Sequence, residues 1–341
     1  MFNKRELLKL QGQGVRQQIS TRQDYQMNKR ILVCSVTGLL GVFACLPSAD
    51  ESMPEGSEFV PPRDTDVLIA ELIYTPEGIA SIGAPENLTQ RRDYDNQPHF
   101  TPDGSGFWYT INDPQNDQAD IWRYDFATAS VTRVTMSSPE SEYSATPLPD
   151  GSGVSVIRVE SDSTQRLWRF DLDGANQEVL LPNVAPVGYH AWVDESTVVL
   201  FVLGDPTTLQ RADVRTGKTE VLAENIGRSI QQIPGSNDVS YAQVHENGTS
   251  TIMRLPSGSA LPEPIAEAVI GGSFHAWAPD GLLLMASGPA VYAWSVTSNE
   301  WTPIADFSHL NISVSRLAVS PDGARVAMVA EIASIPGFPS N

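Results

Sequence analysis

Two histidines occur in nearly the same tetrapeptide, and their residue type suits metal chemistry. Residues Tyr189–Trp192 read Tyr-His-Ala-Trp, and residues Phe274–Trp277 read Phe-His-Ala-Trp. A neutral imidazole is a good ligand for a transition metal, and a side-chain amide oxygen can join such a set. The candidate ligands of a divalent metal are His190, Gln231 and His275, with His99 as a candidate fourth. The alternative is structural: the two tetrapeptides are one repeated packing motif, in which each histidine bonds a backbone group.

Other kinds of catalysis find no support in the sequence. There is no Gly-x-Ser-x-Gly motif that would expose a nucleophilic serine, and no glycine-rich loop follows a strand to hold phosphate. The formal net charge of −19 opposes binding to nucleic acid. The sequence therefore favours a protein that is not an enzyme. An enzymatic function stays an alternative because of the candidate metal site.

The triplet Pro-Asp-Gly recurs along the chain, at residues 102–104, 149–151, 279–281 and 321–323. Proline presets the first corner of a tight turn, aspartate accepts hydrogen bonds from nearby N–H groups, and glycine tolerates the positive φ that ends the turn. An apolar run follows each triplet, which predicts a strand after the turn. Weaker copies of the turn lie near Asp194 and Gly235. These aspartates are thus predicted to be turn residues rather than catalytic ones.

A longer unit repeats in phase with this turn. Residues Ile121–Asp125 read Ile-Trp-Arg-Tyr-Asp, and Leu167–Asp171 read Leu-Trp-Arg-Phe-Asp. Four short strands in a period of roughly 42 to 47 residues are typical of a β-propeller blade. The predicted fold is all-β: a six-bladed propeller over residues 64–331, with four antiparallel strands in each blade.

The two ends of this region are predicted to share the last blade. The sixth repeat, Leu317–Ala330, supplies only two strands. Val67–Leu72 has the pattern of a third strand, and Pro85–Thr89 that of a fourth. The N-terminal strands are therefore predicted to close the ring, which would hide sheet edges that could otherwise pair with other chains.

The repeat resembles that of the TolB family. The matching motifs are Thr-Pro-Asp-Gly at 101–104, Ser-Pro-Asp-Gly at 320–323, Asp-Ile-Trp-Arg-Tyr-Asp at 120–125 and Asn-Leu-Thr at 87–89. The resemblance covers about residues 64–331 and implies a TolB-like propeller without the α/β domain that precedes it in TolB, the periplasmic component of the Tol–Pal system. It also implies binding in the cell envelope. The candidate His and Gln ligands resemble the manganese site of oligogalacturonate lyases.

The predicted fold gathers the candidate residues at one place, because the first strand of each blade lines the central channel. When the blades are aligned by their turns, the two histidines and Gln231 take equivalent positions in blades three, four and five. An arginine beside a tyrosine can grip a carboxylate or a peptide end, and Arg228 and Glu142 also fall on the loops between blades. The residues predicted to bind a ligand at the channel mouth are Tyr189, His190, Gln231, His275, Arg316, Tyr143 and Asp95.

The N-terminal region predicts export. Residues 27–45 contain Lys29 and Arg30, followed by the uncharged run Ile31–Phe43, as in a secretory signal peptide that is too short to span a bilayer. Residues 42–45 read Val-Phe-Ala-Cys, which resembles a bacterial lipoprotein cleavage site and predicts lipidation of Cys45. Cleavage by the ordinary signal peptidase is the alternative. Residues 1–26 are predicted to be an upstream extension, 46–63 a flexible linker and 332–341 a tail.

Two functions fit these features. The first is a non-enzymatic binding or scaffold propeller of a Gram-negative cell envelope, periplasmic or anchored in the membrane as a lipoprotein. It would be monomeric, need no cofactor and recognise a protein segment or small ligand at the channel mouth. The second is a metal-dependent lyase or hydrolase acting on acidic sugars, with His190, Gln231 and His275 as ligands. The acidic composition disfavours the second function, since it repels polyuronates.

Overall fold

The computed structural model describes residues 64–76, 78–113, 118–295 and 298–332. All of them belong to one compact unit, Phe59–Asn341. The predicted extension 1–26, signal peptide 27–45 with Cys45, linker 46–63 and, apart from residue 332, the tail lie outside the described residues.

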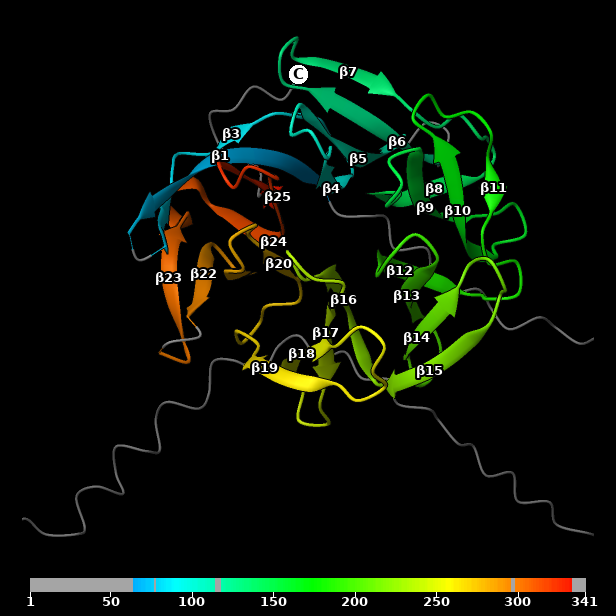
Figure 1. The fold of residues 1–341 in the computed structure, drawn as a ribbon. Coiled ribbons are helices and arrows are strands. Elements are labelled where there is room, and N and C mark those ends of the chain that lie inside the picture. Colours follow the sequence, from blue (N-terminus) through cyan, green and yellow to red (C-terminus); the bar gives the residue numbers. More distant parts are fainter. Residues whose placement is uncertain (1–63, 77, 114–117, 296–297, 333–341) are drawn as a thin grey trace, which may run out of the picture. The chain divides into compact units, whose positions relative to one another are not determined.

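The described residues form six antiparallel sheets arranged around a central axis, which confirms the predicted six-bladed propeller (Figure 1). Within each sheet the strands follow one another from the channel outward. The first strands are β4 (Asp95–Phe100), β8 (Ser141–Pro147), β12 (Val187–Trp192), β16 (Ile226–Gln232), β20 (His275–Trp277) and β24 (Ile312–Val319). The second strands are β5 (Gly106–Asp113), β9 (Gly153–Val159), β13 (Thr197–Val202), β17 (Val239–Val244), β21 (Leu283–Ser287) and β25 (Arg325–Ile332).

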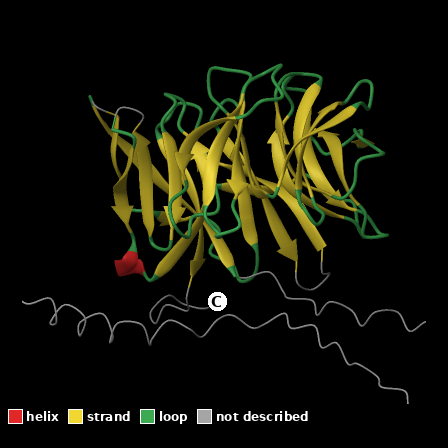
Figure 2. Cartoon of the chain, turned by 90° about the horizontal axis from the view of Figure 1, so that it is seen from below, coloured by secondary structure: helices red, strands yellow, loops and turns green. Residues whose placement is uncertain are grey.

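The outer strands complete the blades. The third strands are β6 (Gln118–Asp125), β10 (Gln165–Asp171), β14 (Thr208–Asp213), β18 (Ser250–Leu255), β22 (Ala290–Ser295) and β1 (Thr65–Thr75). The fourth strands are β7 (Ser130–Arg133), β11 (Glu178–Val179), β15 (Thr219–Glu224), β19 (Glu263–Glu267) and β23 (Glu300–Asp306), with β2 (Gly78–Ile82) and β3 (Glu86–Asn87) sharing the edge of the sixth blade. A helical turn, η1 (Ser308–Leu310), lies in the loop between blades five and six, and loops occupy both faces of the ring (Figure 2).

The sixth blade is closed by the two ends of the described region, as predicted. β1 lies beside β25, with Val67 opposite Val329 and Ala70 opposite Val326 (Figure 1). The predicted fourth strand is present only as the short β3, which pairs with Leu68 and Ile69. The hairpin strand β2, which the sequence patterns did not predict, pairs with the far half of β1 and extends this edge.

The Pro-Asp-Gly segments form the turns between first and second strands. In the first of them the Asp103 carboxylate accepts hydrogen bonds from the Ser105 backbone N–H at 3.0 Å and the Ser105 hydroxyl at 2.8 Å. Gly104 follows with a φ of +69°. A hydrogen bond from Thr101 and those from Ser105 lower the pKa of Asp103 to about 2, so it stays ionised. The predicted turn role of this residue is confirmed.

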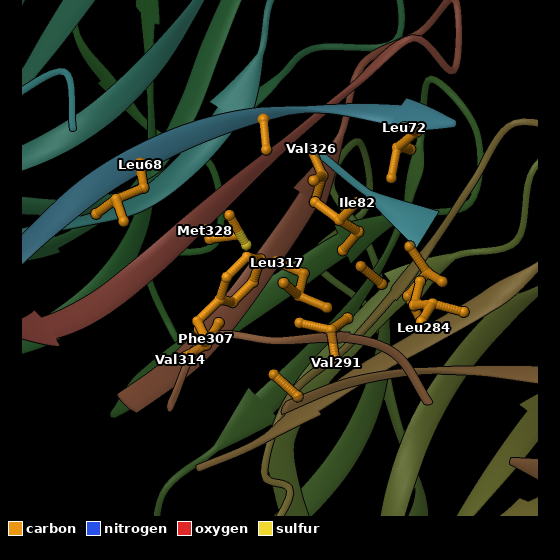
Figure 3. Packing of buried hydrophobic residues seen from close by; sticks show 14 of the residues in the cluster. Leu68, Leu72, Ile82, Leu284, Val291, Phe307, Val314, Leu317, Val326 and Met328 are labelled. Carbon is orange, nitrogen blue, oxygen red and sulfur yellow. The ribbon is translucent and has the colours of Figure 1, made fainter. Parts of the chain in front are cut away.

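The hydrophobic core lies between neighbouring blades rather than at the ring centre. The second strands are covered on both sides by adjacent sheets, which explains why their apolar runs are continuous: Val198, Val199 and Leu200 of β13 are fully buried. The largest cluster joins blades five and six with β1, where Leu68, Leu284 and other apolar side chains pack together (Figure 3). Burial of each such side chain contributes about 1.5–3 kcal/mol, so packing as well as strand pairing closes the ring.

Candidate ligand site in the central channel

The first strands enclose a cavity of about 490 Å³ to which all six blades contribute. This volume lies within the range of pockets that bind small molecules. Residues of the first strands alternate between the cavity and the seams between blades, because successive side chains of a strand point to opposite sides. Two levels of side chains line the cavity. From this alternation, the lining residues nearer the Pro-Asp-Gly turns are His99, Thr146, Ala191, Gln231, Ala276 and Ala318, and those nearer the inter-blade loops are Gln97, Ser144, Tyr189, Ser229, Phe274 and Arg316.

Arg316 reaches across the channel at the second of these levels. Its Nη2 donates a hydrogen bond of 2.8 Å to the Tyr189 hydroxyl. Arg316 belongs to blade six and Tyr189 to blade three, which lie opposite each other in a ring of six, so this bond spans the channel. The guanidinium carbon also lies 3.6 Å from the ring centroid of Phe274 and 5.1 Å from that of Tyr189, which are cation–π contacts. We call these three residues the Arg316 bridge.

Further aromatic and basic groups surround the Arg316 bridge. Burial raises the pKa of Tyr94, and the nearby hydroxyls of Tyr189 and Tyr143 raise it further, whereas the positive charges of Arg316 and Arg228 lower it. These groups are therefore close enough to interact electrostatically. Within the described part of the chain, neither arginine has an ion pair. The channel thus holds a local positive charge in a protein whose net charge is strongly negative.

His190 and His275 point into the seams between blades. His190 Nε2 lies 2.7 Å from the hydroxyl of Ser155, a residue of the preceding blade. His275 repeats this contact with Ser240 at 2.8 Å, and its Nδ1 lies 3.0 Å from the hydroxyl of Ser229. Burial lowers the pKa of both histidines to about 3, so both are neutral. Each imidazole therefore joins neighbouring blades, and its partner is a serine hydroxyl rather than a backbone group.

The tryptophans of the two tetrapeptides strengthen the same seams. Trp192 Nε1 donates to the Ser155 hydroxyl at 2.9 Å, and Trp277 Nε1 donates to the Ser240 hydroxyl at 2.8 Å. Each serine also donates to a carbonyl of its own first strand, at Thr146 and Gln231. The repeated tetrapeptide is thus a repeated interaction between blades.

The predicted metal ligands do not share one side of their strands. His190 pairs with Leu200 and His275 with Met285, whereas Gln231 lies one position nearer its turn, and the blade-four residue in register with the histidines is Ile230. Gln231 and His99 face the cavity, and burial lowers the pKa of His99 to about 4. Among the described residues, no group of three or more His, Cys, Asp or Glu side chains is arranged to hold a metal ion. Metal binding by the predicted set stays a prediction and would require the seam hydrogen bonds to break.

Two acidic residues near the predicted mouth lie away from the cavity. Asp95 is fully buried between blade one and the closing blade, and its carboxylate is 3.6 Å from Arg91. Burial raises its pKa to about 7, and the Arg91 charge opposes this rise. Glu142 is also fully buried and pairs with Arg158 at 2.8 Å. Neither carboxylate lines the cavity.

The sequence patterns pointed to Tyr189, Tyr143 and Arg316 as site residues but did not select Tyr94 or Phe274. Phe274 falls at the same position of the aligned blades as Tyr189 and Arg316, so the alignment reached it without selecting it. Tyr94 lies beyond the point where the pairing register of β4 shifts, between Asn96 and His99. Such a bulge changes which side chain faces the channel, so counting back from the turn does not place Tyr94. The sequence feature that could have identified Tyr94 as a site residue is an aromatic side chain next to the charged Asp95.

Comparison with known proteins identifies the class of fold. No family model matches the sequence, and no curated protein matches it. Among solved structures, a protein described as TolB from Agrobacterium tumefaciens superposes with a TM-score of 0.60 and 16% identity, over 78% of this chain and 98% of that one. TolB from Acinetobacter baumannii gives a TM-score of 0.53 and 13% identity, over 78% of this chain and 64% of that one. A chain of a nidogen/laminin complex gives a TM-score of 0.54 and 11% identity, over 74% of this chain and 97% of that one.

These likenesses establish the architecture. The protein is a six-bladed β-propeller whose fold is similar to that of TolB structures, and the predicted resemblance in fold is confirmed. Identities this low carry no information about ligand or partner. None of the helical segments within the described ranges has the length and apolar character required to cross a bilayer.

Proposed function

We propose that this protein is a non-enzymatic binding propeller of the cell envelope that recognises a protein segment or a small ligand in its central channel. The observation that carries the proposal is the Arg316 bridge, in which side chains from blades three, five and six meet over one cavity. Residues that are far apart in the sequence are held by rigid strands, as a preformed binding site requires. The TolB-like fold supports the role of a scaffold.

Capture of envelope proteins tests this function. The purified propeller would be immobilised and exposed to a membrane and periplasm extract, and the wild type would be compared with Tyr189→Ala and Arg316→Ala. A binding partner that uses the channel is lost in both variants and retained by Arg215→Ala, because Arg215 is an exposed arginine that pairs with Glu195 on the surface of blade three. Identical captured proteins in all four samples would place binding elsewhere on the molecule and refute the proposal.

The envelope location rests on residues 27–45, which predict a secretory signal peptide with a lipoprotein-like cleavage site. Lipidation of Cys45 is expected to place the propeller in the membrane fraction of bacteria that express it. Cys45→Ser should then move it to the periplasmic fraction and abolish labelling with a radioactive fatty acid. Unchanged fractionation together with absent labelling in the wild type would support cleavage by the ordinary signal peptidase instead.

A further inference from the structure

Arg316 differs from the other shielded arginines of the described chain. Every other arginine there that is partly or fully buried forms an ion pair with a carboxylate. These pairs are Arg123 with Asp125, Arg133 with Asp120, Arg158 with Glu142, Arg166 with Glu160, Arg169 with Asp171 and Arg211 with Glu220. Arg316 is half-buried and has only the Tyr189 hydroxyl and two aromatic rings as partners. A shielded cation without a counter-ion is costly, and here it faces a cavity.

The geometry of the Arg316 bridge leaves the guanidinium edge as the place for a ligand. A guanidinium carries five N–H donors in one plane, and it matches a carboxylate through two parallel hydrogen bonds. The guanidinium carbon lies 3.6 Å from the Phe274 ring centroid, and the Tyr189 hydroxyl accepts a hydrogen bond from Nη2. A carboxylate that approaches from the cavity can therefore use the remaining donors, or replace the Tyr189 hydroxyl as a stronger, charged acceptor.

The cavity walls indicate the body of such a ligand. The level next to the aromatic rings of the Arg316 bridge includes Ala191, Ala276 and Ala318. These small and aromatic side chains leave room for a flat or apolar group and favour its burial. The cavity volume of about 490 Å³ suits a small acid or the last residue or two of a peptide.

The end of the cavity beside the Pro-Asp-Gly turns disfavours ligands with several negative charges. Pro102, Pro149 and Pro321 line the cavity there, and each is followed by an aspartate. Hydrogen bonds within the turns lower the pKa of Asp103, Asp150 and Asp322, so these carboxylates are ionised and exposed. A phosphate ester or a polyuronate would be repelled at this rim, whereas a single carboxylate on a neutral body loses little.

From these features we infer that the channel binds a single carboxylate carried on an apolar or aromatic body, with Arg316 as the residue that holds the carboxylate. This inference rests on the proposed function and names the ligand chemistry of the same site. Two sources share this chemistry: a free aromatic acid and the C-terminal residue of a peptide.

The test compares each acid with its neutral amide. Intrinsic tryptophan fluorescence would be titrated with N-acetylphenylalanine and its primary amide, and separately with acetyl-Gly-Gly-Phe as free acid and as amide. The acid of the preferred source should bind at least about tenfold more tightly than its amide, as expected for a lost charge-assisted pair. A preference for the single amino acid would identify a small-molecule site, and a preference for the tripeptide would identify a site for a peptide end.

Variants connect this preference to Arg316. Arg316→Gln should bind the acid and its amide equally weakly, Arg316→Lys should retain part of the preference, and Arg215→Gln should behave as the wild type. Unfolding curves would show that each variant is folded. Equal binding of acid and amide by the wild type, or an undiminished preference in Arg316→Gln, would overturn the inference. If neither acid nor amide binds but capture of an envelope partner still depends on Arg316, the proposed function stands and the carboxylate assignment fails.

Discussion

The seams between blades and the central channel both contain shielded polar side chains, but they satisfy them differently. In the seams, His275 contacts two serine hydroxyls, and Trp277 donates to one of the same hydroxyls. In the channel, Arg316 has a single hydrogen bond and no carboxylate among the described residues. His275 and Trp277 thus find their hydrogen-bond partners within the protein, whereas Arg316 keeps N–H donors that a ligand can use.

This difference separates structural polar residues from those available for binding. A buried polar group whose partners are all within the protein contributes to stability, because removing it leaves those partners unpaired. A polar group that lines a cavity without a full set of partners contributes less to stability and more to recognition. The seams and the channel should therefore respond to mutation in opposite ways.

The largest expected effect on stability is in a seam. His275→Ala removes the partner of Ser229 and Ser240 and leaves a cavity at a fully shielded position. The free energy of unfolding should fall by about 2–4 kcal/mol, as measured by urea denaturation. His309→Ala, at an exposed histidine in the loop between blades five and six, is the matched control and should change stability by less than about 0.5 kcal/mol. Similar losses in both variants would remove the distinction between seam and surface.

Asp95 is an exception among the polar residues of the seams, because its carboxylate oxygens have no hydrogen-bond partner. Its pKa is raised to about 7 in the folded protein, above its ordinary value of 3.8. Between these values the folded state holds a proton that the unfolded state has released, so stability falls as pH rises from about 4 to 7 and stays lower above pH 7.

Asp95→Asn should remove this pH dependence. The neutral amide avoids burial of a charge, so the variant should be more stable than the wild type at pH 8, by up to about 4 kcal/mol. The advantage should shrink towards pH 4, where the wild-type carboxyl is also neutral. Denaturation curves at both pH values measure this. A variant that is less stable than the wild type at pH 8 would show that attraction to Arg91 outweighs the cost of burial.

The smallest expected effect on stability is in the channel. Arg316→Ala loses one hydrogen bond and two cation–π contacts but also removes a half-buried charge without a counter-ion. These contributions oppose each other, so the free energy of unfolding should change by less than about 1 kcal/mol in either direction. Thermal unfolding monitored by circular dichroism measures it. A loss as large as that of His275→Ala would show that the Arg316 bridge holds the blades together.

The fold was predictable because the same pattern of a turn followed by an apolar strand recurs along the chain. The turn glycines at 104, 151, 281 and 323 all adopt positive φ, and one weak copy of a strand does not obscure a period of this kind. The closing pair of β1 and β25 followed from counting strands. The hairpin strand β2 did not, because it extends one blade only and has no counterpart elsewhere in the repeat.

The site was predictable in part. Alignment of the blades placed Tyr189 and Arg316 beside the channel, and both line the cavity. It could not tell that His190 and His275 turn to the seams, because this depends on the side of the strand that each residue occupies. Their serine partners, Ser155 and Ser240, lie on second strands of the preceding blades, and no local sequence pattern links such distant positions.

Pairing of β1 with β25 also constrains the order in which the protein can assemble. β1 is among the first strands of the propeller to be synthesised, and its partner is the last. Until the chain reaches Ile332, the apolar side of β1 has no blade to join, and closure must bring together segments that are far apart along the chain, which is slow. During synthesis and export, β1 is therefore the segment most in need of protection by chaperones.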